Sequence, residues 1–213
     1  MTEIARISTP LSEAWPTWLM LGLLLCLVLS EVLQPDSFSS VFRSTFTRLE
    51  RVYGDRARNF YGVLLLNTFR IGTVAMALYV FTYSHAPFSL LTYGSIILLI
   101  IAIILVKMLV SGLVSYTFEL GRTTALFLPQ YDNLWTILCL LLYPVTLLCI
   151  NLESAVLLWI AIGIVALFVA LMLYKIMQYF YAGPKSLLYL MIYVVTLELL
   201  PLGAIMVTTR LLT

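Results

Sequence analysis

The sequence has few charged residues and almost no histidine. Its 213 residues include 12 Lys and Arg, 10 Asp and Glu and one His, whereas 62% are hydrophobic. A water-soluble domain of this length needs far more polar surface than these side chains supply. The net charge of +2 is also too small and too localised for a nucleic-acid surface, so we expect no nucleic-acid partner. The composition therefore indicates an integral membrane protein.

The sequence also lacks the residue clusters of metal sites, disulfide frameworks and common active sites. Cys26, Cys139 and Cys149 all lie inside apolar stretches, where a thiol behaves as a small hydrophobic group. The single histidine, His85, stands in a short connection beside Pro87. There is no Gly-rich phosphate loop and no zinc-binding helix motif. We therefore expect no metal, no cofactor and no enzymatic activity.

What the sequence has instead is six stretches that are long and apolar enough to cross a bilayer. About 20 apolar residues, each rising about 1.5 Å along a helix, cover a hydrocarbon core of roughly 30 Å. The polar run 131–133 reads as a helix cap ahead of the fourth stretch. We predict an all-α transmembrane bundle in a single membrane domain over residues 1–213. The six stretches lie at about 16–33, 61–83, 89–110, 134–151, 154–176 and 186–209.

The connections between these stretches carry a consistent bias in basic residues. By the positive-inside rule, the basic side faces the cytoplasm, so both termini are expected outside it. The alternative is five spans with 16–33 lying in the membrane interface, which moves only the N-terminus. Two basic residues, Arg6 and Arg210, fall on the outer side. Nine fall on the inner side: Arg43, Arg48, Arg51, Arg56, Arg58, Lys107, Arg122, Lys175 and Lys185.

An amphipathic helix is predicted between the first two spans, over about 38–53. At 100° per residue, its aromatic and aliphatic side chains fall on one arc and its basic side chains on the other. Such a helix lies flat on the inner leaflet, where its arginines meet anionic lipid headgroups. A docking site for a cytoplasmic partner is the alternative. The membrane-surface basic residues are Arg43, Arg48, Arg51, Arg56 and Arg58.

Two ionisable residues, Arg70 and Glu198, sit near the middle of predicted spans. A charge at this depth costs a few kcal/mol and is retained mainly where it meets a partner or water. Counted from the inner ends of their spans, Arg70 lies about 14 Å deep and Glu198 about 18 Å deep, so an ion pair is geometrically permitted. Asn67 shares the helical face of Arg70. The pair is favoured as a neutral clasp between helices. The alternative is an ion or proton path, or a site where Arg70 holds an anionic headgroup.

Two prolines are expected to kink the spans that contain them. Pro201 frees the carbonyl of Leu197 close to Glu198, and Pro144 frees the carbonyl of Leu140. Broken helices form the midplane sites of many transporters, although prolines in spanning helices also serve packing alone.

The end of the chain resembles a known family. The run Ser186-Leu187-Leu188-Tyr189-Leu190 leads into Leu197-Glu198-Leu199-Leu200-Pro201-Leu202, which is similar to the closing helix of an uncharacterised inner-membrane family of Bacteroidota, a domain of unknown function. The order of features from about Trp15 onward is similar as well. This resemblance implies a polytopic protein of the inner membrane, where termini outside the cytoplasm are periplasmic, and it implies no activity.

Three functions stay open on these grounds. The favoured one is a non-catalytic membrane component that contacts the lipid bilayer and assembles with a membrane-protein partner. The second is a small transporter or lipid-handling protein that uses Arg70, Asn67 and Glu198 beside the Pro201 kink. A membrane-embedded enzyme has the least support, because no catalytic constellation is found.

Overall fold

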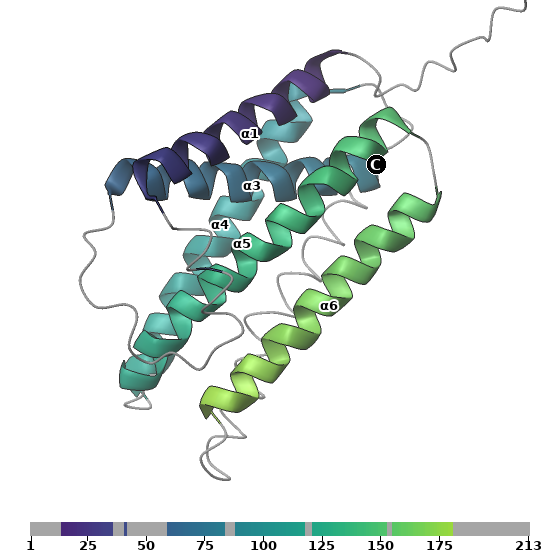
Figure 1. The fold of residues 1–213 in the computed structure, drawn as a ribbon. Helices are drawn as coiled ribbons and strands as arrows, with labels where there is room; N and C mark the ends of the chain where they lie inside the picture. Colours follow the sequence, from purple (N-terminus) through teal and green to yellow (C-terminus); the bar gives the residue numbers. More distant parts are fainter. Residues whose placement is uncertain are drawn as a thin grey trace, which may run out of the picture.

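The chain is all-helical in the part that the structure describes. This computed structural model describes residues 14–35, 41, 59–83, 88–117, 121–152 and 155–180. Five helices lie there, and each is long and apolar enough to cross a membrane. Figure 1 shows them as α1 (Ala14–Leu33), α3 (Phe60–Thr82), α4 (Leu90–Thr117), α5 (Gly121–Asn151) and α6 (Ala155–Phe180). They contain the first five predicted stretches, whereas the predicted span 186–209 and most of the predicted surface helix 38–53 lie outside the described residues.

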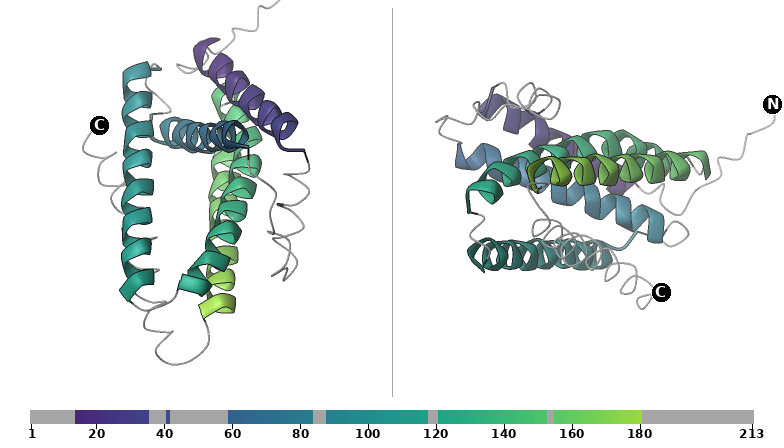
Figure 2. Two further views of the ribbon diagram at one scale, coloured as in Figure 1. Left: turned by 90° about the vertical axis from the view of Figure 1, so that its left-hand side faces the viewer. Right: turned by 90° about the horizontal axis from the view of Figure 1, so that it is seen from below.

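Helix α3 is the centre of the bundle. It packs against α1, α4 and α5, while α6 packs along α5. In the left view of Figure 2, α3 is seen almost end-on, with α4 on one side and the pair α5 and α6 on the other. In Figure 1, α4, α5 and α6 alternate in direction, as expected for consecutive spans joined by short connections, whereas α3 crosses α4 and α5 at a steep angle (Figure 2). The middle of α3 is therefore flanked by other helices, and most of its residues from Phe69 to Val80 are buried.

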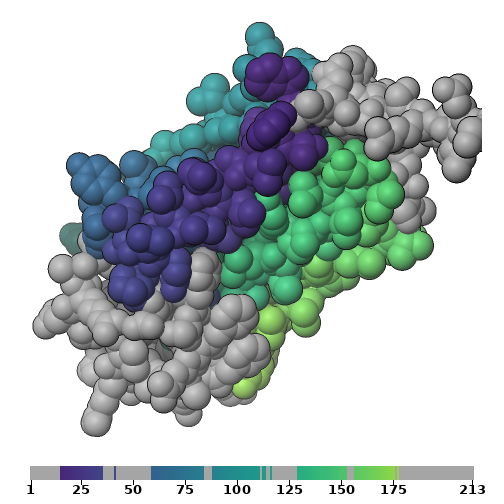
Figure 3. Space-filling view, turned by 45° about the horizontal axis from the view of Figure 1, so that its top comes forward, coloured from purple at the N-terminus to yellow at the C-terminus, as the bar shows by residue number. Residues whose placement is uncertain are grey.

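The start of α3 and its close contact with α1 both follow from local sequence. Asn59 precedes the helix, and its side chain caps it by accepting a hydrogen bond from the Tyr61 amide at 3.2 Å. Small residues then allow helices to approach closely in lipid. At Gly72 the approach is so close that a Cβ atom would overlap the side chain of Leu23 on α1. Figure 3 shows the outer surface of α1 lying along α5.

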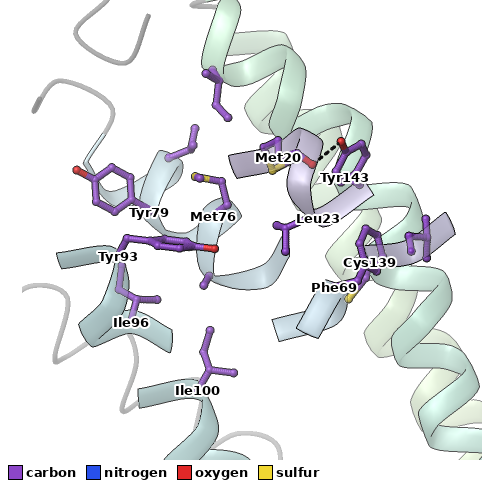
Figure 4. Packing of buried hydrophobic residues seen from close by; sticks show 14 residues of the cluster. Met20, Leu23, Phe69, Met76, Tyr79, Tyr93, Ile96, Ile100, Cys139 and Tyr143 are labelled. Carbon is purple, nitrogen blue, oxygen red and sulfur yellow. Dashed lines mark hydrogen bonds between the residues drawn. The ribbon is translucent and has the colours of Figure 1, made fainter. Parts of the chain in front are cut away.

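The main core joins α1, α3, α4 and α5 (Figure 4). Two of its hydroxyl groups are bonded to backbone carbonyls of neighbouring helices, which satisfies them away from water. Tyr143 donates to the carbonyl of Met20 at 2.9 Å, and Tyr93 donates to the carbonyl of Gly72 at 3.2 Å. The residues labelled in the figure are Met20, Leu23, Phe69, Met76, Tyr79, Tyr93, Ile96, Ile100, Cys139 and Tyr143.

The fourth predicted stretch belongs to a longer helix than the sequence suggested. Helix α5 begins at Gly121, so the expectation of a cap at 131–133 is wrong, and these residues are helical. The reason is that apolar composition marks where a helix crosses the bilayer, whereas helical hydrogen bonds continue beyond it. Pro129 and Pro144 both lie inside α5, which continues as helix through each of them. Pro201, the other expected kink, lies outside the described residues.

Candidate functional site

Arg70 is a charged residue on the central helix of the described bundle. It stands ten residues after Phe60, which places it about 15 Å from the start of α3 at helical rise. Its side chain is buried, with 8% of its surface exposed. Because α3 is the central helix, this burial places the guanidinium among protein groups rather than lipid.

The guanidinium of Arg70 connects α3 to α5 through hydrogen bonds. Its Nη1 donates to Oδ1 of Asn67, one turn earlier on α3, at 3.1 Å. Its Nη2 donates to the Thr136 hydroxyl on α5, and that hydroxyl donates in turn to the carbonyl of Asp132 at 2.9 Å. Hydrogen bonds to a charged donor are among the stronger ones in proteins. Arg70 therefore joins two helices in the interior of the bundle.

Several other residues singled out from the sequence lie outside the part of the chain that the structure describes. Glu198 and Pro201 lie outside the described residues, so the Arg70–Glu198 ion pair remains a prediction. The same holds for the basic residues of the surface helix, Arg43, Arg48, Arg51, Arg56 and Arg58.

A buried polar face of α5 leads from its N-terminal part to Arg70. Gln130, Asn133 and Thr136 are spaced by three residues, which places them on one side of the helix. Their exposed fractions are 4%, 3% and 0%. Sequence reasoning placed Asn133 in a cap ahead of the apolar run and did not single out Gln130. The signal that finds them is the three-residue spacing itself, which continues into the buried Cys139.

On the other side of Arg70 the packing is apolar. The Cys139 thiol contacts the backbone carbonyl of Arg70, with its Sγ at 3.7 Å. Beyond it, the rings of Phe69 and Tyr143 lie 5.8 Å apart, and Met20 of α1 is fully buried against them (Figure 4). The surroundings of the guanidinium are thus polar toward the start of α5 and apolar toward its end.

A second polar contact joins the C-terminal half of α4 to the N-terminal half of α5. Nζ of Lys107 donates to the Tyr131 hydroxyl at 2.6 Å and lies 3.9 Å from the centre of that ring. Tyr131 stacks on Trp135, which meets Phe168 of α6 edge-on. A lysine over an aromatic face gains electrostatic attraction to the ring. This row of contacts links three helices on the side predicted to face the cytoplasm.

The described side chains include five charged ones, and Arg70 stands near the middle of its helix. They are Glu31, Arg70, Lys107, Asp132 and Lys175. Within the described ranges, no group of three His, Cys, Asp or Glu residues stands close enough to hold a metal ion.

Comparison with known proteins gives one match. A family model described as a domain of unknown function (DUF4271) matches residues 16–208. No curated protein and no solved structure matches the chain.

Proposed function

We propose that this chain, which belongs to the DUF4271 family, is a non-catalytic component of the cell inner membrane that assembles with another membrane protein. The observation that carries the proposal is the set of hydrogen bonds made by Arg70. Its guanidinium joins α3 to α5 through Asn67 and Thr136. A charge retained at this depth therefore has a role in holding the bundle together.

The chemistry of the groups around Arg70 supports a positioning role over a catalytic one. A guanidinium in a protein does not release its proton, so it serves neither as general acid nor as general base. The side chains that accept these two hydrogen bonds, Asn67 and Thr136, are neutral. Thr136 also donates to a carbonyl of its own helix. Among the described residues, this hydroxyl meets a guanidinium and a carbonyl and no base that would activate it as a nucleophile.

The outer face of α6 supports assembly with a partner. This helix packs along α5 with one side, and Gly163, Ala166 and Ala170 are exposed on the opposite side. A Cβ atom added at Gly163 would meet nothing within 4 Å. In lipid, small residues on an exposed face permit the close approach of another helix. We place the partner's transmembrane helix against this face.

The proposed orientation follows the basic residues. Lys107 and Lys175 lie at the helix ends that face the cytoplasm under the positive-inside rule. In this arrangement both termini are periplasmic, 186–209 is a sixth span, and the helix 38–53 rests its arginines on the inner leaflet.

Site-specific photo-crosslinking in native membranes tests the assembly. A benzophenone amino acid at Ala166 is expected to capture a membrane protein. The same group at Leu98, which is 69% exposed on α4, is the lipid-facing control. Gly163→Leu should abolish the protein adduct, whereas Val165→Leu on the same helix should keep it. Lipid adducts alone at both positions would refute the proposal.

A second candidate function is a small transporter or lipid-handling protein that uses Arg70, Asn67 and Glu198. The buried polar face formed by Gln130 and Asn133 favours it, because polar residues inside a membrane bundle often mark a path for ions or substrates. A Glu198→Gln variant that folds, retains every partner and loses a measurable flux would replace the first proposal by this one.

A further inference from the structure

We infer that the C-terminal stretch 186–209 packs on the face of α3 opposite α1, where the carboxylate of Glu198 accepts a hydrogen bond from Asn67. Helices α1, α4 and α5 already pack against α3 (Figure 2), and this stretch completes its surroundings. The inference takes 186–209 as the sixth span of the orientation proposed above. It makes no use of the outer face of α6, so it and the proposed assembly are refuted by different results.

One face in the first half of α3 has no described helix against it. On one side, Gly62 lies so close to the end of α1 that a Cβ atom would meet the side chain of Gln34. At 100° per residue, Phe60, Leu64 and Asn67 lie on the opposite side. All three are exposed, Phe60 to 72% and Leu64 to 52%. The contacts of α3 with α4 and α5 given above involve later residues, so they leave this face open.

The amide of Asn67 has a fixed orientation on this face. Its Oδ1 accepts the hydrogen bond from Nη1 of Arg70, and a guanidinium has only donors, so the oxygen must face Arg70. The Nδ2 group is then at the other end of the amide, and no described residue accepts from it. Asn67 lies within the helix Phe60–Thr82, which is apolar and long enough to cross a membrane. There an N–H group without an acceptor costs free energy, so this face requires an acceptor.

Glu198 supplies an acceptor in the remaining sequence. It is the single charged residue in the stretch 186–209, which is otherwise largely apolar. A carboxylate inside a membrane is retained mainly where donors or a cation face it. Glu198 thus complements both the donor that Asn67 presents and the positive charge of Arg70 behind it.

The level of Glu198 in the bundle follows from the course of α6. The ring of Phe168 meets Trp135 of α5 edge-on, and α6 continues to Phe180, about 18 Å further toward the side proposed to be cytoplasmic. After a short turn, a helix that begins with the stretch 186–209 reaches Glu198 after about the same 18 Å in the opposite direction. Glu198 therefore returns to the level of Trp135, which is next to the residue of α5 that accepts from Arg70.

The chemistry of the open face favours docking there over docking on the outer face of α6. Near the same level, α6 exposes Gly163, Ala166 and Ala170, which carry no side-chain donor. The Asn67 amide is instead polarised by the hydrogen bond that it accepts from Arg70, which strengthens its N–H groups as donors. A carboxylate on the open face of α3 therefore meets a strengthened donor with a guanidinium behind it.

Disulfide formation between paired cysteines tests the docking. One cysteine is placed at Val194, one turn before Glu198. The other is placed at Leu64, about one turn before Asn67 on the open face, or at Ala170 on the outer face of α6 as the comparison. Copper phenanthroline oxidises each pair in native membranes, and mass spectrometry of the linked peptides measures the rate. The native thiols are first replaced by alanine in the full chain: Cys26, Cys139 and Cys149.

We expect the pair Leu64→Cys and Val194→Cys to link at least about tenfold faster than the pair with Ala170→Cys, because a docked helix raises the effective concentration of the facing thiol. Adding Glu198→Leu should slow the first pair about three- to tenfold, which is the factor that one interhelical hydrogen bond in a membrane implies. Glu198→Gln keeps an acceptor oxygen and should retain most of the rate.

Three results would each overturn the inference. They are a pair with Ala170→Cys that links as fast, disulfides that form only between two chains, and a rate that Glu198→Leu leaves unchanged. None of them bears on the crosslink at Ala166 that tests the assembly, because that crosslink reports another protein on α6.

A stability measurement keeps the inference falsifiable if a cysteine pair fails to fold. The losses on Asn67→Leu and Glu198→Leu should be non-additive, because both remove the same contact. The matched control is Thr68→Val, which removes a neighbouring exposed hydroxyl bonded to its own helix, and its loss should add to that of Glu198→Leu. Additive losses for Asn67→Leu as well would show that Glu198 does not meet Asn67.

Discussion

Three buried threonines permit a controlled measurement of what Arg70 contributes. Thr73, Thr136 and Thr146 all have 0% exposed surface. Replacing threonine with valine exchanges a hydroxyl for a methyl group of similar size. Thr136→Val removes an acceptor of Arg70, whereas Thr146→Val removes only a hydrogen bond to the carbonyl of Leu142 in its own helix.

The structure sets the expected magnitudes. A hydrogen bond to a charged group contributes about 1.5–3 kcal/mol in soluble proteins. Interhelical bonds in a membrane average about 0.6 kcal/mol, with a maximum of about 1.7. Thr136→Val should therefore destabilise by about 1–2 kcal/mol. Thr146→Val should cost less than about 0.5 kcal/mol, since a threonine bond to its own helix adds little. Thr73→Val should be neutral or stabilising, because the Thr73 hydroxyl has no partner among the described residues.

Reversible unfolding in mixed micelles of dodecyl maltoside and SDS measures these differences. Because Thr136 and Thr146 each donate to the carbonyl four residues earlier, subtracting one loss from the other isolates the contact with Arg70. The loss on Thr136→Val should largely disappear in an Arg70→Met background. Equal losses for the two threonines, or a Thr136→Val loss that persists without Arg70, would show that the contact contributes nothing.

Three further predictions concern the same helices. Gly72→Ala should separate α1 from α3 and cost about 1–3 kcal/mol, since the new methyl overlaps Leu23; the midpoint of thermal unfolding in detergent should fall accordingly. Replacing Arg70 or Glu198 alone with an apolar residue should destabilise more than replacing both, and additive losses in a double-mutant cycle would show that the two do not meet. Tyr143→Phe should cost about 1 kcal/mol through loss of the bond to α1, and trypsin should then release α1 sooner; an unchanged digestion pattern would contradict this.

The spans were predictable from the sequence because the hydropathy of a span is summed over many residues. The end of α4 is an example: the absence of proline after Lys107 predicts a helix that continues to about residue 119, and α4 extends to Thr117. The start of α5 was not predictable in this way. Residues 121–133 are helical. Hydropathy reports only the transfer of a segment into lipid, so it does not detect a helix that extends beyond the apolar run.

The surroundings of Arg70 were predictable only in part. Its burial follows from the cost of exposing a charge to lipid, and its proximity to Asn67 follows from helical periodicity. Its contact with Thr136 does not follow in this way. The depth of a residue in the bilayer shows which residues lie at the same level, but it does not show which of them are in contact. A threonine inside an apolar run also gives little signal, since its hydroxyl is already satisfied by its own helix.

The long chain separation between Arg70 and Thr136 has a consequence for how the protein is made. The two residues are 66 positions apart. At ribosomal rates of about 5–20 residues per second, Thr136 is synthesised about 3–13 s after Arg70. During that interval Asn67, only three residues earlier in the same helix, is the acceptor that travels with the guanidinium. Helix α3 therefore enters the translocon with one acceptor for Arg70 already present, and the second acceptor is added when α5 is synthesised.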